Sequence, residues 1–217
     1  MNKDLVLLFD MDGTIADTDP MLFETFNILY DRYKGGKRKS KEEVYYFSGP
    51  PIRQTLSREF PDQDVEFMYK EFFEISRSFY PTHIFAYPNE REVLLELKKE
   101  GCRLGVVTNK QHNLAEYVLE LLNLKDIFEL CIGYDDVSKG KPDPEGILKA
   151  IDYFKTDKEH TIYVGDNEID FKTANNAGVR CALVSDGPRL LDPNLKPFIK
   201  FKSYLELKEK IIYGKDL

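Results

Sequence analysis

Short apolar runs bounded by polar residues recur along the chain and predict the strands of a sheet. They lie at residues 5–9, 103–107, 128–132, 161–164 and 179–184. The later runs are separated by helical patterns, one of which places its apolar face at Leu114, Tyr117, Val118 and Leu121. Another begins at Asn89, with Glu92 three residues later, and ends before Gly101. This alternation predicts an α/β fold, a Rossmann-like doubly wound parallel sheet that binds ligands at the carboxyl ends of its strands.

The segment from Asp17 to Ala86 interrupts this alternation with helical spacing. Two amphipathic patterns in it place large apolar side chains three or four positions apart, at Leu22, Phe26, Leu29 and Tyr33 and at Met68, Phe72, Ile75 and Phe79. Ser40 followed by Glu43 is typical of a capping box. We therefore predict an α/β core domain from residues 1–16 and 87–217 and an inserted all-helical cap domain from residues 17–86. Both linkers leave the ligand-binding edge of the sheet, where a lid belongs.

Composition and charge exclude several classes of function. A chain of 217 residues with 42% hydrophobic residues can bury a sizeable core. Its formal net charge of -7 argues against a nucleic-acid binder, because clustered lysine and arginine grip phosphate backbones. The first apolar run is too short for a membrane span or a signal peptide. Cys102, Cys131 and Cys181 have no metal-ligand spacing and fit buried thiols, so we expect a cytoplasmic protein.

The first apolar run ends in the sequence DMDGT, which places Asp10 and Asp12 at the functional edge of the predicted sheet. An aspartate and a glycine after a strand are also common in ordinary turns. A catalytic interpretation fits the same residues, because Gly13 lets the backbone approach a ligand and Thr14 adds a hydroxyl group. Two carboxylates two positions apart can face one site in different roles, one as a nucleophile and one in proton transfer.

Two later loops supply polar groups that would meet these aspartates at the same edge. The strand ending in GVVTNK delivers Thr108 and Asn109. The Thr108 hydroxyl and the amides that follow can bind phosphate oxygens, although Thr-Asn is also a frequent helix cap. Lys141 directly precedes Pro142 and a helix that Pro144 opens, so it is less mobile than a lysine in an ordinary loop.

A fourth element, GDNEID, ends another apolar run in Asp166 and places Asp170 four positions later, on the same face if a helix begins there. Together with Asp10, these carboxylates would repel one another by about 4 kcal/mol per close pair at an effective dielectric constant of about 20. Such a cluster requires a cation. Carboxylate oxygens with room left for water and phosphate suit Mg²⁺, and Lys141 adds one further positive charge.

Taken in this order, the four elements resemble the haloacid dehalogenase-like hydrolase superfamily. The resemblance rests on DxDGT from Asp10 to Thr14, Thr108 with Asn109, Lys141 before a proline, and GDxxxD from Asp166 to Asp170. It covers residues 1–16 and 87–217, and the helical insertion occupies the position of the family's first type of cap. The resemblance implies a Mg²⁺-dependent phosphatase. In it, Asp10 attacks phosphorus, while Asp12 first protonates the leaving oxygen and then activates water.

The resemblance also implies the remaining roles. Mg²⁺ would be held by the carboxylates of Asp10 and Asp166 and by the Asp12 backbone carbonyl. Asp170 is a further candidate for the metal site, where it would orient Lys141 or a metal-bound water. The phosphoryl oxygens and their charge would be held by Thr108, Asn109 and Lys141.

Departures within the family narrow the implied substrate. Family dehalogenases lack the second aspartate, so Asp12 argues against carbon–halogen hydrolysis. Family mutases often carry a histidine near the position of Leu22, so a mutase is also disfavoured. What remains resembles a phosphoglycolate phosphatase, and the stretch FSGPPIRQTL, residues 47–56, also resembles the cap of a related bacterial pyrophosphatase. Arg53 in this stretch is either the residue that recognises the substrate or a solvated arginine at a helix start.

Several alternatives stay open at this point. The expected substrate is a small phosphorylated metabolite such as phosphoglycolate, with pyrophosphate, a nucleotide or a sugar phosphate as alternatives. A phospho-accepting signalling receiver is disfavoured by the chain length and the helical lid, and a binding protein is disfavoured by the intact motifs. We expect no membrane or nucleic-acid partner, and both a monomer and a homodimer fit the sequence.

Overall fold

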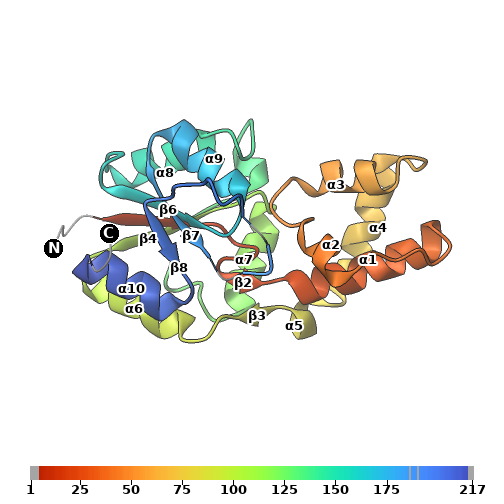
Figure 1. The fold of residues 1–217 in the computed structure, drawn as a ribbon, viewed down its shortest axis with the longest axis horizontal. Coiled ribbons are helices and arrows are strands. Elements are labelled where there is room, and N and C mark those ends of the chain that lie inside the picture. The colour runs from red at the N-terminus through yellow and green to blue at the C-terminus, as the bar shows by residue number, and fades with distance from the viewer. Residues whose placement is uncertain (1–4, 186, 190, 215–217) are drawn as a thin grey trace.

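The computed structural model describes residues 5–185, 187–189 and 191–214 of the chain. Its central sheet consists of parallel strands in the order β5-β4-β1-β6-β7-β8 (Figure 1). In chain order these strands are β1 (Val6–Phe9), β4 (Arg103–Val107), β5 (Leu130–Ile132), β6 (Thr161–Gly165), β7 (Arg180–Val184) and β8 (Ile199–Phe201). All but β8 coincide with the apolar runs of the sequence, so the predicted parallel sheet is confirmed.

Helices cover both faces of this sheet, because side chains alternate along each strand. In β1, Leu7 and Phe9 face one core, while Val6 and Leu8 face the other. The first face is covered by α6 (Glu90–Lys99), α7 (His112–Leu121) and α10 (Tyr204–Tyr213). The second face is covered by α8 (Glu145–Phe154) and α9 (Glu168–Ala177). Within the described ranges, no helix combines the length and the apolar character needed to cross a bilayer.

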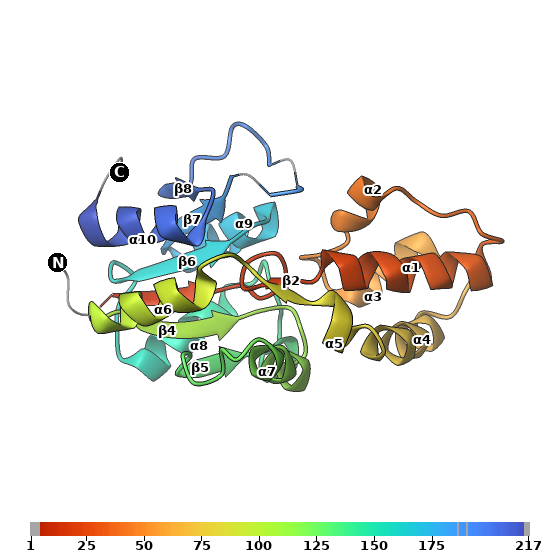
Figure 2. The ribbon, with the colours of Figure 1, turned by 90° about the horizontal axis from the view of Figure 1, so that it is seen from below.

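The helical segment between β1 and β4 lies beside the sheet domain (Figure 2) and has a hydrophobic core of its own. Phe26 is fully buried there, and its ring centroid lies 4.7 Å from that of Phe47 and 5.8 Å from that of Phe72. The helices of this segment are α1 (Asp19–Tyr33), α2 (Lys41–Tyr45), α3 (Ile52–Glu59), α4 (Val65–Arg77) and α5 (Tyr80–His83). The insertion is therefore helical as predicted, except at Asp17 and Phe85–Ala86, which pair as strands.

Both connections between the cap and the sheet run through a short antiparallel ribbon (Figure 1). It is formed by β2 (Ala16–Asp17) and β3 (Phe85–Ala86), with Ala16 opposite Ala86. Each strand has only two residues, which is too short for an alternating pattern to be visible in the sequence. The pairing draws the two linkers together, so the cap is attached to the core at one place.

The helix starts singled out in the sequence differ in their capping. Ser40 and Glu43 form the predicted capping box: the Ser40 N–H donates to the Glu43 carboxylate at 3.0 Å, and the Glu43 N–H donates to the Ser40 hydroxyl at 3.3 Å. Asn89 starts the predicted helix α6, but its φ of 59° is left-handed and its side chain caps nothing. Instead, Glu90 accepts a hydrogen bond from the N–H of Tyr87 at 3.2 Å.

The register of the sheet brings three of the predicted site residues to one edge. Phe9 at the end of β1 pairs with Val106 in β4 and with Val164 in β6. Asp10, Thr108 and Asp166 follow these strands directly, and the cap lies beyond the same edge (Figure 1). This arrangement agrees with the expectation that the site lies at the carboxyl ends of the strands.

A buried hydrogen-bonded chain ties helices α6 and α10 to the DMDGT loop. The Tyr204 hydroxyl lies 2.8 Å from the carbonyl oxygen of Thr14 and 3.0 Å from Oε1 of Glu90, which is 1% exposed. A hydroxyl has one hydrogen to donate, so Tyr204 can serve Thr14 while a protonated Glu90 donates to Tyr204. Burial raises the pKa of Glu90 to about 8, and the neutral acid therefore prevails at pH 7.

We expect stability to fall with rising pH because of Glu90. Between its unfolded pKa of 4.5 and its folded pKa of about 8, the folded chain holds a proton that the unfolded chain releases. Glu90→Gln keeps both hydrogen bonds without ionising. Denaturant unfolding should give the two proteins nearly equal stability at pH 4.5 and should favour the variant by about 4 kcal/mol at pH 8.5. A stability difference that does not change with pH would contradict this.

Candidate active site

The DMDGT loop turns sharply after β1. The carbonyl oxygen of Met11 accepts hydrogen bonds from the N–H groups of both Ile15 and Ala16 at 2.9 Å. Gly13 has a φ of +85°, and a Cβ atom at this position would lie 2.3 Å from Oδ2 of Asp166. Only glycine meets both requirements. The loop can therefore pack directly against the end of β6.

Lys141 links two of the predicted aspartates. Its Nζ lies 2.8 Å from Oδ1 of Asp10 and 2.7 Å from Oδ1 of Asp170, and all three side chains are at most 3% exposed. The other oxygen of Asp170 accepts the N–H groups of Asp166 and Asn167 at 3.1 and 3.0 Å. Both oxygens of Asp170 thus bind protein groups, and through these contacts Asp170 holds Lys141 beside Asp10.

Burial and mutual repulsion dominate the electrostatics of this edge. Burial raises the pKa of Asp10 above its ordinary value although Lys141 opposes the shift. The ammonium of Lys141 is also disfavoured by burial, yet Asp10 and Asp170 raise its pKa well above the usual value. Burial is the first cause of the raised pKa of Asp10, whereas the neighbouring carboxylates are what raise the pKa of Lys141.

Asp166 lies opposite Asp10 with both of its oxygens in contact with protein groups. Oδ1 accepts a hydrogen bond from the Thr14 hydroxyl at 3.2 Å, and Oδ2 accepts one from Arg189 Nη1 at 2.7 Å. Burial raises the pKa of Asp166 even though Arg189 favours the carboxylate. Asp166 and Asp170 do not share a helix face as expected, because α9 begins at Glu168 and Asp166 precedes it. The Asp170 carboxylate bends back toward Asp166 instead.

The donor set of this cluster fits a divalent metal ion. Oxygens of Asp10, Asp166 and Asp170 lie within 4.8 Å of one another, and all three residues are buried. Among the described residues, no group gives Asp10 Oδ1 a hydrogen bond of ordinary geometry, and Lys141 approaches it only as an ion pair. Buried carboxylate oxygens with unused lone pairs are what Mg²⁺ binds. Asp10 has the most free capacity for an ion, because both oxygens of Asp166 and both oxygens of Asp170 already accept hydrogen bonds or ion pairs from protein groups.

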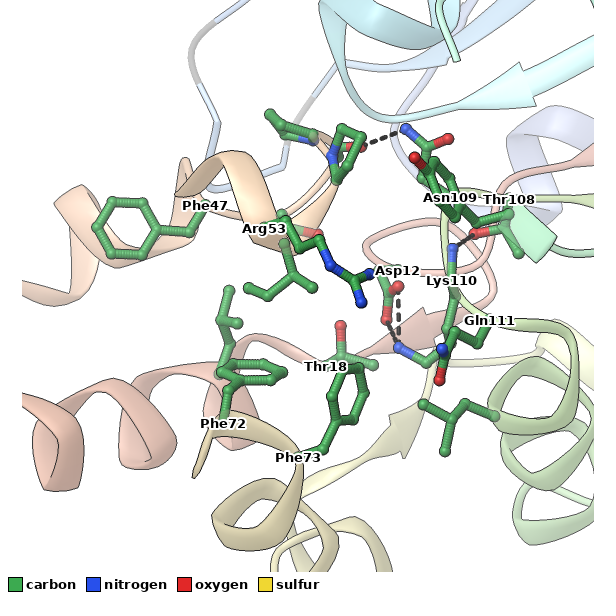
Figure 3. A pocket seen from close by; sticks show the side chains of 18 of the residues that line it. Asp12, Thr18, Phe47, Arg53, Phe72, Phe73, Thr108, Asn109, Lys110 and Gln111 are labelled. Carbon is green, nitrogen blue, oxygen red and sulfur yellow. Dashed lines mark hydrogen bonds and ion pairs between the residues drawn. The ribbon is translucent and has the colours of Figure 1, made fainter. Parts of the chain in front are cut away.

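Asp12 lines a pocket under the cap, as Asp10 does, but it pairs with a different cation. Lys110 binds it with Nζ 2.7 Å from Oδ1 and 3.0 Å from Oδ2 (Figure 3). The Lys110 side chain is only 9% exposed, and although burial disfavours its charge, Asp12 raises its pKa above the ordinary value. Asp10 and Asp12 therefore have separate cation partners, which matches the different roles expected of them.

Thr108 and Asn109 lie at the end of β4, as the sequence predicts, but their side chains differ in availability. The Thr108 hydroxyl is buried at the pocket and accepts the Lys110 N–H at 3.2 Å. The Asn109 amide donates to the carbonyl oxygens of Gly49 and Lys141 at 3.0 and 3.3 Å, and its oxygen accepts the Lys141 N–H at 2.8 Å. Its side chain thus joins the cap loop and the Lys141 loop.

Arg53 reaches into the pocket from the cap side, toward Asp12 (Figure 3). Its guanidinium carbon lies 3.5 Å from the centroid of the Tyr69 ring. Glu66 binds one edge of the guanidinium, with distances of 2.7 Å from Nε and 3.1 Å from Nη2. Apart from Arg53, the cap contributes mostly apolar groups to the lining, among them Met21, Leu22, Phe47, Ile52, Phe72 and Phe73.

Two residues of the site were missed in the sequence. Lys110 is the last residue of the motif GVVTNK, but nothing in the sequence indicates that its side chain points into the protein. Arg189 follows β7, in a connection without periodicity, and only the three-dimensional fold brings it to Asp166.

Comparisons with known proteins show the family and the fold of the chain. A family model described as haloacid dehalogenase-like hydrolase matches residues 7–184. A protein of Caldanaerobacter subterraneus subsp. tengcongensis, provisionally named pyrophosphatase PpaX, is 35% identical over 182 residues, which are 84% of this chain and 82% of the relative. Pyrophosphatase PpaX of Bacillus cereus is 32% identical over 179 residues, 82% of each chain. The crystal structure of a predicted phosphoglycolate phosphatase from Haemophilus somnus superposes with a TM-score of 0.87 at 20% identity, over 97% of this chain and 99% of that one.

We expect Mg²⁺ to stabilise the protein through Asp166. Binding to the folded state alone should raise the unfolding free energy by about 2.7 kcal/mol at a hundredfold excess over Kd. Asp166→Asn removes one ligand and should abolish this gain, whereas Glu168→Gln removes an exposed carboxylate nearby and should preserve it. Thermal unfolding with and without Mg²⁺ measures the effect. An equal gain in Asp166→Asn would show that the ion binds elsewhere.

Proposed function

The chain belongs to the haloacid dehalogenase-like hydrolase family, and from this premise we propose that it is a phosphatase that hydrolyses a small phosphate ester. The observation that carries the proposal is the division of labour between two aspartates of one loop. Asp10 is buried beside Lys141 and the other carboxylates, whereas Asp12 faces the pocket and is held by Lys110. A nucleophile and a proton carrier need such different surroundings.

The first half of the reaction transfers the phosphoryl group to Asp10. One oxygen of Asp10 attacks phosphorus in line, and the bond from phosphorus to the leaving oxygen breaks. Asp12 gives its proton to that oxygen, so that the product leaves as an alcohol or acid. Lys141 lies 2.8 Å from the attacking carboxylate and offsets the charge that gathers as the phosphoryl group approaches.

The second half releases phosphate and restores the enzyme. Asp12, now ionised, takes a proton from water, and the water oxygen attacks phosphorus as the bond to Asp10 breaks. Lys110 holds Asp12 in place for both steps through its contacts with the two carboxylate oxygens. Phosphate leaves, and Asp12 is again protonated.

We assign the remaining groups by their contacts. Mg²⁺ bound by Asp10, Asp166 and the Asp12 carbonyl would neutralise phosphoryl charge as a Lewis acid. The Thr108 hydroxyl would donate to a phosphoryl oxygen. Asn109 would contribute through its backbone N–H, because its side chain already binds Gly49 and Lys141.

The helical segment of residues 17–86 is proposed to act as the cap domain that selects the leaving group, over a core of residues 1–16 and 87–217. Its face toward the pocket is mainly apolar, and Arg53 is its cation there. A phosphoglycolate-like leaving group is our first candidate. Inorganic pyrophosphate is the second, because Arg53 could bind a leaving phosphate and two relatives bear the name pyrophosphatase.

We expect turnover to depend on both aspartates, in different ways. With p-nitrophenyl phosphate, the natural protein should release many phosphates per molecule, and Asp10→Asn should release none above background. Asp12→Asn should lose about 10²–10⁴-fold in rate and should accumulate phosphorylated Asp10, because this leaving group departs without a proton but water still needs a base. Phosphate assays and intact mass measure both effects. A single phosphate per natural protein molecule, with no turnover, would instead indicate a signalling receiver.

We expect Arg53 to matter only for substrates that carry a second anionic group besides the phosphoryl group that is transferred. Arg53→Gln should lower kcat/KM for pyrophosphate and phosphoglycolate by about 10–100-fold, which is the value of a charged hydrogen bond. It should leave p-nitrophenyl phosphate nearly unchanged. Arg58→Gln, on the same helix but paired with Glu59 outside the pocket, is the matched control. Equal losses on all three substrates would contradict a role for Arg53 in recognising the leaving group.

A further inference from the structure

Arg189 joins the sheet edge to two parts of the cap. Its side chain is 3% exposed, and each nitrogen of its guanidinium donates a hydrogen bond to a different partner. Nη1 donates to Asp166 at 2.7 Å, and Nε donates to the carbonyl oxygen of Tyr45 at the end of α2, at 2.8 Å. Nη2 donates to Asp19 in the first turn of α1. One side chain therefore contacts a proposed metal ligand and the first two helices of the cap, α1 and α2.

The contact with Asp19 is distinctive because it is ionic. Two other core side chains reach the cap here: Asn109 donates to Gly49 O at 3.0 Å, and Asn167 donates to Ser48 O at 3.2 Å. Both are neutral amides bound to main-chain oxygens. Among the ion pairs of the described residues, only that of Arg189 with Asp19 connects the cap helices with the core. A movement of the start of α1 away from the sheet edge would break it.

The charges around Arg189 leave room for a divalent ion without displacing the arginine. Six carboxylates gather at this edge, from Asp10, Asp12, Asp17, Asp19, Asp166 and Asp170. Three buried cations face them, from Lys110, Lys141 and Arg189. The carboxylates outnumber the cations by three, and one Mg²⁺ would offset most of this excess.

We propose that Arg189 couples closure of the cap to metal binding, by dividing its charge between Asp19 and Asp166. With the cap closed, Asp19 takes part of the guanidinium's attraction, and Asp166 keeps more of its negative charge for a metal ion. With the cap open, Arg189 is left with Asp166 alone and repels the ion more strongly. Because coupling is reciprocal, a bound ion must favour the closed cap by the same factor.

This coupling rests on the metal site of the proposed function, but it predicts opposite effects for its two partners. Arg189→Gln removes a positive charge beside Asp166 and should tighten Mg²⁺ binding. Asp19→Asn keeps Arg189 and removes its competing partner, so Mg²⁺ binding should weaken. We expect about fivefold or more in each direction, at the lower end of measured couplings between sites. If both residues only supported the fold, both variants would weaken binding.

The test is a calorimetric titration of the metal-free protein with Mg²⁺ at pH 8, without substrate. Arg103→Gln is the charge-matched control, since it removes an arginine from an exposed ion pair at the opposite end of β4 and should not change Kd. Arg189→Lys is a second variant: it keeps the charge beside Asp166 without bridging to Asp19, so it should weaken binding as Asp19→Asn does. Small-angle scattering supplies the second readout, in which Mg²⁺ should compact the natural protein but not Arg189→Gln.

The outcomes separate the two proposals. Tighter binding in Arg189→Gln together with weaker binding in Asp19→Asn supports the coupling. Unchanged Kd in both, or a change in the same direction, overturns the coupling and leaves the metal site standing. If the natural protein binds no Mg²⁺ and Asp166→Asn behaves identically, the metal site of the proposed function fails as well.

Discussion

The mutual repulsion of carboxylates at one edge of the sheet is the constraint on which the rest of the site depends. Strand order brings Asp10 and Asp166 together, and the start of α9 adds Asp170. Such a cluster is stable only if cations are held close to it, and buried cations in turn need rigid surroundings. The fold meets this need by placing Lys141 and Arg189 in loops that are themselves tied to the cluster.

The parts of the fold that follow from local sequence were predictable. Five strands are apolar runs with clear boundaries, and the cap helices repeat large apolar residues such as Phe26 and Phe72 at helical spacing. Because parallel strands end at a common edge, the aspartates that follow β1 and β6 could be placed together without coordinates. β8 could not be predicted, since its three residues alternate only once between buried and exposed.

The parts that depend on distant partners were not predictable. Sequence patterns place ionisable side chains in solvent, but three of them are buried here: Lys110, Arg189 and Glu90. Each is buried because a residue far along the chain forms an ion pair or a hydrogen bond with it. Asn109 was placed at the correct edge, but its side chain turned out to bind main-chain groups of the cap loop and the Lys141 loop. Position follows from the order of strands, whereas the direction of a polar side chain follows from its whole environment.

Side chains of the core bind the cap largely by hydrogen bonds to main-chain oxygens, those of Tyr45, Ser48 and Gly49. A carbonyl group is present whatever side chain a residue carries. Substitutions along this loop can therefore reshape the wall of the pocket while these hydrogen bonds are kept, except at Gly49, where φ is +101° and a Cβ would lie 2.8 Å from Nδ2 of Asn167. In the proposed function, closure of the cap and choice of substrate therefore rest on different atoms, so the wall of the pocket can change while the way of closing stays the same.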